Sequence, residues 1–434
     1  MQADAQIQTR RRAFLGATIG HVIEWYDFGV YGFLAAYIGQ QFFVSSDPTT
    51  SLLSSFAVFA LSFFVRPLGG FFFGPLSDRI GRRQTLVIVV TLMSGSTFLI
   101  GLLPTYARIG ILAPALLVLL RCVQGLSAGG EIGTTTSFLA EYAGPGRRGY
   151  STSWLMVTGV LGFVIGGLVA NGMTFGFGAP FMTEFGWRIP FFLAGPLGAV
   201  ALYIRLRLED SPEFVSLARA GKTSGSPLRD SMGYRKSLAI IFFCIALHNS
   251  LFYLVLVYAS TYMSRELKFS SGTTLTFVLI ASLIAAVIMP FGGAFTDRYG
   301  RKLYLMITGA LATASMFWFF HSSLSATPAT FIVALLIMAV CFALYASSTF
   351  ALMSELLPTQ VRSTGIAIAY NLPTAIFGGS TPFISTWLIQ ATGDVTAPKY
   401  FYVAIGILAV IALGQIRSRD LEVKAELSPA VAAE

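Results

Sequence analysis

The sequence is poor in charge. Only 11% of its 434 residues are Asp, Glu, Lys or Arg, whereas 55% are hydrophobic and the mean hydropathy is +0.72. Soluble domains typically carry about 25% charged residues. This deficit excludes an ordinary soluble protein. It predicts an all-α polytopic membrane protein, in which the chain length is divided among membrane spans rather than soluble domains.

Cysteine and histidine are equally scarce, with three of each. Cys122, Cys244 and Cys341 lie far apart in hydrophobic segments and fit no disulfide or metal-site spacing. The histidines are scattered too, so neither a metal cluster nor a nucleophile–base pair is visible. We therefore expect no metal, no cofactor and no enzymatic activity.

Hydrophobic segments of spanning length predict twelve transmembrane helices in two sets of six. The first set lies at about 14–42, 52–76, 84–103, 111–140, 151–174 and 187–206. The second set lies at about 236–263, 273–296, 303–322, 328–354, 363–390 and 399–416. We expect an N-terminal half over residues 1–206, a cytoplasmic linker over 207–235, a C-terminal half over 236–420 and a cytoplasmic tail over 421–434.

The formal charge of +9 is distributed unevenly along the chain. If the N-terminus is cytoplasmic, 22 of the 29 Lys and Arg fall on the cytoplasmic side, and this count includes Arg205 at the end of the sixth span. Such a bias is the positive-inside pattern of a plasma-membrane protein. We expect both termini in the cytoplasm and a lipid bilayer, not nucleic acid, as the surroundings of the protein.

A polar motif recurs after the second and the eighth spans, 219 residues apart. Its first copy contains Gly74, Asp78, Arg79, Gly81, Arg82 and Arg83, and its second copy contains Gly293, Asp297, Arg298, Gly300 and Arg301. A further echo pairs Glu141…Arg148 with Glu355…Arg362. Two similarly oriented repeats are typical of transporters. Neither motif has the spacing of a phosphate-binding loop, so we expect no ATP as the energy source.

Several ionisable residues lie inside the predicted spans. In the first span, His21, Glu24, Asp27 and Tyr31 share one helix face. At ~1.5 Å per residue, Glu24, Arg66 of the second span and Glu131 of the fourth all lie roughly 15 Å from the cytoplasmic edge. That depth is near the middle of the hydrocarbon core, where an unpaired charge is costly. The pattern predicts a coupled charge network.

We expect Glu24, Asp27 and Glu131 to be the candidates for binding the transported proton. Low-dielectric surroundings raise the proton affinity of a carboxylate, and a nearby cation lowers it. The alternatives are that Glu24 and Arg66 form a static bridge and that Glu131 fixes the packing of its helix. Arg121 is the candidate for gripping a substrate carboxylate, because its planar fork matches that group in two bonds. The alternative for Arg121 is partnership with Glu131 or Asp27.

Six further residues are candidates for lining the substrate site. They are Arg66, His21, Tyr31, Trp154, Tyr253 and Asn371. Aromatic rings there could hold a quaternary ammonium by cation–π attraction. For the aromatic residues the alternative is ordinary packing, and for His21, as for His248, it is a hydrogen-bonded packing role.

The doubled loop motif resembles the signature of the major facilitator superfamily. Further stretches resemble its metabolite:proton symporter family: Glu24–Phe28, Arg66–Gly70, Gln124–Glu131 and Gly186–Phe192. The resemblance implies a major facilitator fold of two six-helix pseudo-repeats and proton symport by alternating access. It also implies that the two loop motifs act as a latch that gates the cytoplasmic side.

Within that family, the sequence resembles two branches. Ser153–Leu155 and Gly162–Gly166 are similar to the proline/glycine-betaine symporters, although His21 and Arg121 replace the Asn and Lys of those carriers. Ala375–Pro382 is similar to the citrate carriers. The resemblance implies a functional monomer that uses the proton gradient to move a small carboxylate-bearing metabolite. That solute is an osmolyte such as proline or betaine, or an organic acid. The alternatives are a citrate, dicarboxylate or aromatic-acid symporter and, more remotely, a transport-inactive sensor.

Overall fold

The structure is a computed structural model that describes residues 2–45, 48–143, 146–324 and 327–417. Within these ranges the chain is helical and contains no β-strand. It divides into two compact units. The first comprises the chain up to Tyr142 together with Thr158–Gly225, and the second comprises Ala143–Val157 and the described chain from Ser226 onward. The domain boundaries predicted from the sequence stay a prediction, and the tail at 421–434 lies outside the described residues.

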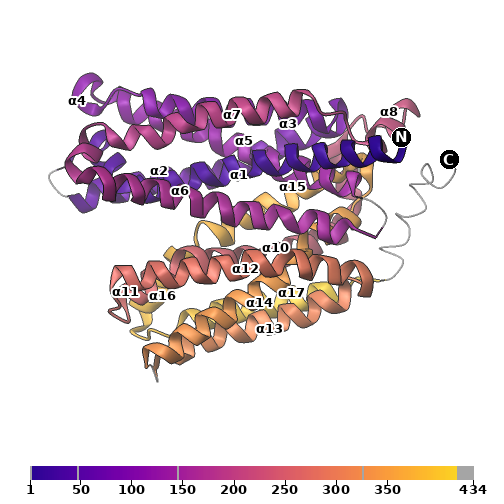
Figure 1. The fold of residues 1–434 in the computed structure, drawn as a ribbon. Helices are drawn as coiled ribbons and strands as arrows, with labels where there is room; N and C mark the ends of the chain where they lie inside the picture. Colours follow the sequence, from indigo (N-terminus) through magenta and orange to yellow (C-terminus); the bar gives the residue numbers. More distant parts are fainter. Residues whose placement is uncertain (1, 46–47, 144–145, 325–326, 418–434) are drawn as a thin grey trace. The chain divides into compact units, whose positions relative to one another are not determined.

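The first unit is built from long helices that lie side by side (Figure 1). They are α1 (Gln2–Phe42), α2 (Pro48–Ile80), α3 (Arg82–Leu102), α5 (Leu112–Tyr142), α7 (Ile189–Leu206) and the part of α6 (Arg148–Glu184) from Thr158 onward. Short helices α4 (Tyr106–Ile109), η1 (Gly186–Arg188) and α8 (Pro212–Arg219) connect or follow them.

The second unit contains α10 (Arg235–Tyr253), α11 (Ala259–Arg265), α12 (Ser271–Tyr299), α13 (Lys302–His321), α14 (Pro328–Glu355), α15 (Arg362–Pro373), α16 (Thr381–Thr392) and α17 (Pro398–Gly414). The π-helical turn η3 (Leu254–Tyr258) joins α10 to α11, and a second π-helical turn, η6 (Thr374–Gly378), follows α15. The remaining short elements are α9 (Pro227–Ser231), η2 (Met232–Tyr234), η4 (Ser322–Leu324) and η5 (Thr359–Val361).

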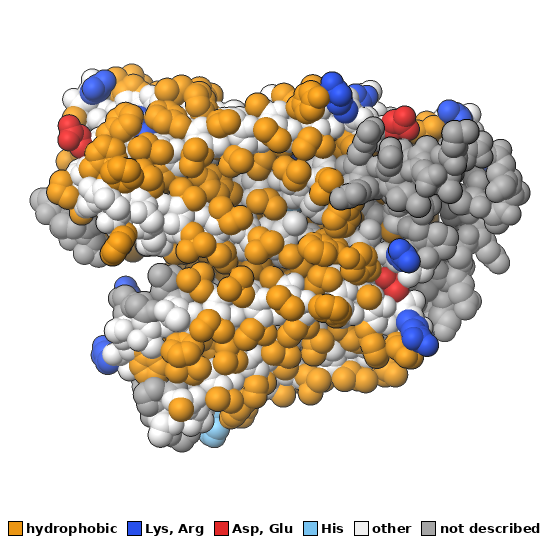
Figure 2. Space-filling model, viewed as in Figure 1, with side chains coloured by type: hydrophobic (Ala, Val, Ile, Leu, Met, Phe, Trp, Pro, Cys, Tyr) orange, Lys and Arg blue, Asp and Glu red, His pale blue; other side chains and the backbone are white. Residues whose placement is uncertain are grey.

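Nine helical segments of the described chain are long and apolar enough to cross a membrane. Four further helices account for the three remaining predicted spans. Helix α1 is continuous but carries buried polar residues, α15 and α16 are separated by a π-helical turn and correspond to one span, and α17 has 17 residues. Figure 2 shows hydrophobic side chains over most of the visible helix surface, with Lys, Arg, Asp and Glu near helix ends. Such a surface suits contact with lipid.

Glycines let α2 and α5 approach each other closely. A Cβ atom at Gly125 would lie 2.2 Å from the backbone oxygen of Ser62, and one at Gly129 would lie 2.0 Å from that of Arg66. Larger residues would force the two backbones apart. This contact sets the positions of the charged side chains that α2 and α5 carry into the interior of the first unit.

Candidate proton and substrate site

Asp27 of α1 and Arg121 of α5 form a completely buried ion pair, with 3.0 Å between Oδ2 and Nη1. Gln124 forms hydrogen bonds to both members of this pair. Its Nε2 donates to Asp27 Oδ1 (2.9 Å) and to Thr97 Oγ1 (2.8 Å), and its Oε1 accepts from Arg121 Nη1 (2.7 Å). Of the two partners expected for Arg121 from the sequence, the structure selects Asp27. Gln124 was not expected in the site.

Arg121 also contacts aromatic rings. Its guanidinium carbon lies 3.9 Å from the ring centroid of Tyr31 and 5.5 Å from those of Phe28 and Phe59. Its Nε and Nη2 are buried and have no hydrogen-bond partner among the described residues. Buried donors are normally satisfied, and the exceptions often mark functional sites. These two nitrogens form one edge of the guanidinium, and that edge can bind a carboxylate in two bonds.

A second buried pair joins Glu24 of α1 to Arg66 of α2, with 3.2 Å between Oε1 and Nη2. The Arg66 guanidinium lies 4.4 Å from the ring centroid of Phe28 and 4.8 Å from that of Phe63. Glu24 Oε2 and Arg66 Nε have no hydrogen-bond partner in the described part of the chain. The pair is therefore held by one hydrogen bond, and each of the two residues keeps one buried polar atom without a hydrogen-bond partner among the described residues.

A third buried pair joins Glu131 of α5 to Arg205 of α7. Arg205 Nη2 lies 2.5 Å from Oε1, Nη1 lies 3.3 Å from Oε2, and Nη1 also donates to the backbone oxygen of Leu86 at 2.7 Å. Although Arg205 lies at the end of the sixth predicted span, it is not an exposed charge. Its side chain is fully buried in the last turn of α7 and reaches inward to Glu131.

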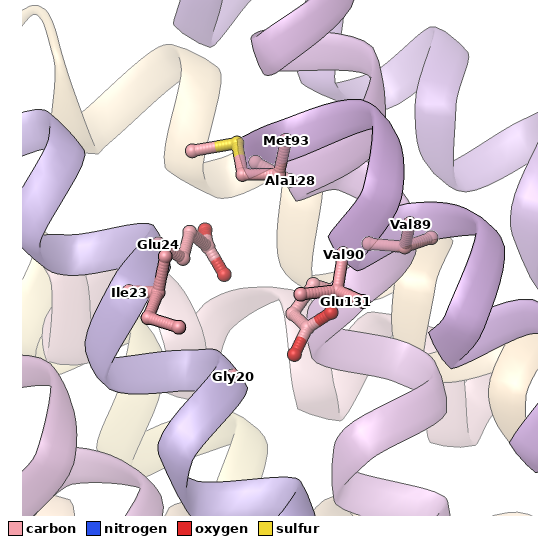
Figure 3. Close-up of a pocket in the computed structure, with 8 residues that line it drawn as sticks. All are labelled: Gly20, Ile23, Glu24, Val89, Val90, Met93, Ala128 and Glu131. Atoms are coloured by element: carbon pink, nitrogen blue, oxygen red, sulfur yellow. The ribbon is translucent and has the colours of Figure 1, made fainter. Parts of the chain in front are cut away.

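A small cavity lies between α1, α3 and α5. It is lined by Gly20, Ile23, Glu24, Val89, Val90, Met93, Ala128 and Glu131. Figure 3 shows the carboxylates of Glu24 and Glu131 directed into the same space. The cavity measures about 10 Å³, which is close to the minimum that holds one water molecule.

Gly20 makes the Glu131–Arg205 pair sterically possible. A Cβ atom there would lie 1.9 Å from Arg205 Nη2, so Gly20→Ala should push the guanidinium away from Glu131. We expect a loss of up to about 3 kcal/mol of stability, because a disturbed buried pair leaves charge uncompensated. Thermal unfolding of the purified protein measures this loss. Gly32→Ala on the same helix is the control, since nothing lies within 4 Å of its added Cβ; equal melting of both variants would contradict the assignment.

Both ring nitrogens of His21 have hydrogen-bond partners. Its Nδ1 lies 3.1 Å from Thr158 Oγ1, and Trp25 Nε1 donates to its Nε2 at 3.1 Å. Because Nε2 accepts from the indole, Nδ1 is the protonated nitrogen of the neutral ring. This geometry favours the packing role over substrate binding.

The remaining candidate lining residues lie in the second unit. Asn371 donates to the backbone oxygen of Ala367 (2.8 Å), and a Cβ atom at Gly378 would lie 2.8 Å from the Tyr253 ring. Asn249 donates to Thr374 Oγ1 (2.9 Å), which ties α10 to the second π-helical turn. Trp154 belongs to this unit as well. π-helical turns frequently occur at functional sites, so these residues stay candidates.

The first loop motif forms a compact polar cluster at the end of α2. Arg82 pairs with Asp78 (3.2 Å) and with Glu141 of α5 (3.1 Å). Asp210, which follows α7, accepts from the backbone N–H of Arg82 at 3.1 Å and from that of Arg83 at 3.3 Å. Burial raises the pKa of Asp210, although these N–H groups and the Arg82 charge partly oppose the shift. Arg79 donates to the backbone oxygen of Gly225 (2.7 Å), so the motif is anchored to the linker.

The second loop motif binds the start of a helix. Asp297 accepts from the backbone N–H of Gly149 (2.7 Å) and of Tyr150 (2.8 Å), in the first turn of α6. Arg301 pairs with Asp297 (2.9 Å) and with Glu355 (2.6 Å). Burial lowers the pKa of Arg301, but its bonds to Glu355 and Asp297 outweigh burial and raise it. The Arg301–Glu355 pair matches Arg82–Glu141, so the repeat read from the sequence is also a repeated ion pair.

Gly149 allows this contact. A Cβ atom there would lie 2.4 Å from the backbone oxygen of Gly293 and 2.9 Å from Asp297 Oδ1. Gly149→Ala should separate the start of α6 from the second motif and cost about 1–3 kcal/mol, as overpacking typically does. Thermal unfolding and uptake rates test this. Gly172→Ala in the same helix, where the added Cβ meets nothing within 4 Å, is the control. A Gly149→Ala protein as stable and active as that control would contradict the contact.

Comparison with known proteins identifies the family. The model of the Major Facilitator Superfamily matches residues 17–376 and 242–428. The chain belongs to the major facilitator superfamily. It is 34% identical over 415 residues to the proline/betaine transporter of Salmonella typhimurium, covering 92% of this chain and 82% of the relative. It is 33% identical over 420 residues to the citrate-proton symporter of Klebsiella pneumoniae, covering 92% and 90%.

The fold agrees with this membership. A solved structure of the proton:xylose symporter XylE superposes with a TM-score of 0.79 at 17% identity, covering 94% of this chain and 95% of that one. At this identity the likeness concerns the fold alone. The predicted twelve-helix major facilitator architecture and the resemblance to the metabolite:proton symporters are confirmed.

Proposed function

We propose that this protein is a secondary active transporter that moves a small solute bearing one carboxylate together with protons. The observation that carries the proposal is the hydrogen bonding of the three guanidinium nitrogens of Arg121. Its Nη1 is bonded to Asp27 and Gln124, while its buried Nε and Nη2 have no partner among the described residues. The guanidinium thus has one edge bound to an internal carboxylate and another edge suited to a second one.

Proton and substrate are coupled through this shared cation. When Asp27 takes up a proton, its attraction for Arg121 weakens and the guanidinium charge becomes available to a substrate carboxylate. When Asp27 loses the proton, it competes for Arg121 and favours substrate release. Gln124 fixes the positions of the Asp27 and Arg121 side chains relative to each other through a hydrogen bond to each. The proton gradient supplies the energy, and neither ATP nor a cofactor takes part.

The buried charges favour a solute with a single carboxylate. Inside the first unit Glu24, Asp27 and Glu131 are matched by Arg66, Arg121 and Arg205. In the described helices of the second unit, Lys, Arg, Asp and Glu lie at helix ends, and the interior offers neutral groups such as Asn249 and Thr374. One proton on Asp27 therefore leaves one positive charge to balance. Extra carboxylates would remain buried and unpaired, at a cost of several kcal/mol each.

Proline and betaine carry one carboxylate and occur in the names of relatives, as does citrate, which carries three. We favour a zwitterion or simple organic acid, with a citrate-like acid as the alternative. We place the protein in a bacterial plasma membrane with both termini cytoplasmic, because most Lys and Arg of the polar connections then lie inside. It acts as a monomer, and the two loop motifs gate its cytoplasmic side.

Uptake into proteoliposomes under an imposed pH gradient tests the function. The panel contains proline, betaine, 2-oxoglutarate, citrate and benzoate. We expect an inward proton gradient to drive accumulation of a solute with one carboxylate above its external concentration. Accumulation of citrate instead would support the alternative. Counterflow without any response to the gradient would leave a carrier that is not a symporter, and no counterflow for any solute would favour a sensor.

A further inference from the structure

The aromatic rings nearest to Arg121 already bind a cation, which is Arg121 itself. Its guanidinium carbon lies 3.9 Å from the Tyr31 ring centroid and 5.5 Å from that of Phe28. Phe59 lies at 5.5 Å and stacks on Tyr31, with 5.8 Å between the ring centroids and 17° between the ring planes. A cation attracts an aromatic ring within about 6 Å of the ring centroid. These rings therefore stabilise a charge that belongs to the protein.

Arg66 occupies the neighbouring rings in the same way. Its guanidinium carbon lies 4.4 Å from the Phe28 ring centroid and 4.8 Å from that of Phe63. The Trp25 ring follows at 5.8 Å. Phe28, Phe59 and Phe63 also pack on one another, with centroid distances of 5.2 to 6.0 Å. Rings at these distances are in contact, so a further cation does not fit between them.

The three buried carboxylates of the first unit are each paired with an arginine. The pairs are Glu24–Arg66, Asp27–Arg121 and Glu131–Arg205. Positive and negative charges balance when all three acids are ionised, and a proton on Asp27 leaves one net positive charge. The carboxylate of an organic acid neutralises that charge. A zwitterion brings an ammonium group as well as a carboxylate, so one buried positive charge stays uncompensated.

The second unit supplies no buried carboxylate that could neutralise an ammonium group. Each Asp and Glu in its described part is at least partly exposed and lies in a connection, in a short helix or near a helix end: Asp230, Glu266, Asp297, Glu355 and Asp394. Two of them, Asp297 and Glu355, are already paired with Arg301. An ammonium group in an apolar interior without a counter-charge is costly.

We propose that this transporter selects against an ammonium group and takes organic acids in which one carboxylate is the only charged group. This inference rests on the proposed function and deepens it, because it divides the solutes with one carboxylate into anions and zwitterions and chooses the anions. The aromatic rings of the first unit then hold the arginines in place for the carboxylate. The preferred solutes differ from the proline and betaine that occur in the names of relatives.

Two pairs of solutes with matched shapes test the proposal on the wild-type protein. The anion 3,3-dimethylbutanoate is betaine with carbon in place of the ammonium nitrogen, and cyclopentanecarboxylate is the corresponding analogue of proline. Calorimetry on the purified protein gives their dissociation constants near neutral pH. We expect each organic acid to bind at least about tenfold more tightly than its zwitterionic partner, because an uncompensated buried charge costs more than tenfold in affinity represents. Equal or tighter binding of betaine and proline, or no binding of either organic acid, would overturn the proposal.

Substitution of Arg66 separates charge from hydrophobicity, since carbon in place of nitrogen also makes a solute more apolar. Arg66→Gln removes one cation, keeps a donor for Glu24 and leaves that carboxylate available to an ammonium group. We expect the preference for the organic acids to fall by about tenfold, which is the contribution of one charge-assisted hydrogen bond. Arg108→Gln, at an exposed position, is the control and should keep the wild-type preference. An unchanged preference in Arg66→Gln would overturn the proposal.

The outcomes distinguish this inference from the proposed function. Tighter binding of betaine or proline, together with accumulation of either under a proton gradient, would overturn the inference and leave symport standing. Selective binding of the organic acids without accumulation under a proton gradient would contradict the proposed function and support the selectivity, because the dissociation constants are measured without a gradient.

Discussion

Replacing Arg121 with lysine should lower the affinity for the transported solute by about tenfold to a hundredfold. A charge-assisted hydrogen bond contributes about 1.5–3 kcal/mol, and each 1.4 kcal/mol corresponds to a factor of ten. Lysine keeps the positive charge near Asp27 but offers no planar edge equivalent to Nε and Nη2. Solute binding to the purified protein, measured by calorimetry, gives the change directly.

Two further variants make the Arg121 result specific. Arg121→Gln removes the charge and should abolish binding, while Arg108→Lys, at an exposed position, should leave it unchanged. An unchanged affinity in Arg121→Lys would show that a point charge suffices and that the edge formed by Nε and Nη2 of Arg121 does not bind the solute.

Replacing Asp27 with asparagine should abolish proton-driven accumulation while leaving exchange of solute across the membrane. Asparagine can still accept a hydrogen bond from Gln124, which keeps its own bond to Thr97, so the site keeps its shape. It cannot alternate between charged and neutral forms, so Arg121 stays available to the solute at every pH. Uptake under a pH gradient and counterflow without one, in the same proteoliposomes, separate the two activities.

Glu184→Gln is the control for the Asp27 variant, because Glu184 is an exposed carboxylate at the end of α6 and should not affect either activity. Normal accumulation by Asp27→Asn would move the coupling proton away from Asp27. Loss of counterflow as well as accumulation would show that Asp27 is needed for the conformational change itself.

The core of the site could be predicted from the sequence because ionisable side chains are energetically costly in the hydrocarbon core of a membrane. Glu24, Asp27, Arg66 and Arg121 stand out against hydrophobic spans, and helix geometry places them at related depths. The structure joins them as two buried pairs, Glu24–Arg66 and Asp27–Arg121. The repeated loop motif was equally readable, since its glycines and charges recur at identical spacing.

Other parts could not be read from the sequence. Arg205 lies at a span end, where arginine ordinarily faces the cytoplasm, and only the space left by Gly20 reveals that it turns inward. Gln124 is uncharged, so nothing in its sequence context signals that it bridges Asp27, Arg121 and Thr97. The π-helical turns after Tyr253 and Pro373 arise from tertiary packing, which hydrophobic periodicity does not encode.

The central claim is that the proton on Asp27 and the carboxylate of the solute share Arg121. Calorimetric binding of the solute in buffers of different ionisation enthalpy counts the protons taken up as the solute binds. We predict net proton uptake near neutral pH by the wild-type protein and reduced uptake by Asp27→Asn. Binding without proton uptake in the wild-type protein, or uptake unchanged in Asp27→Asn, would contradict the account.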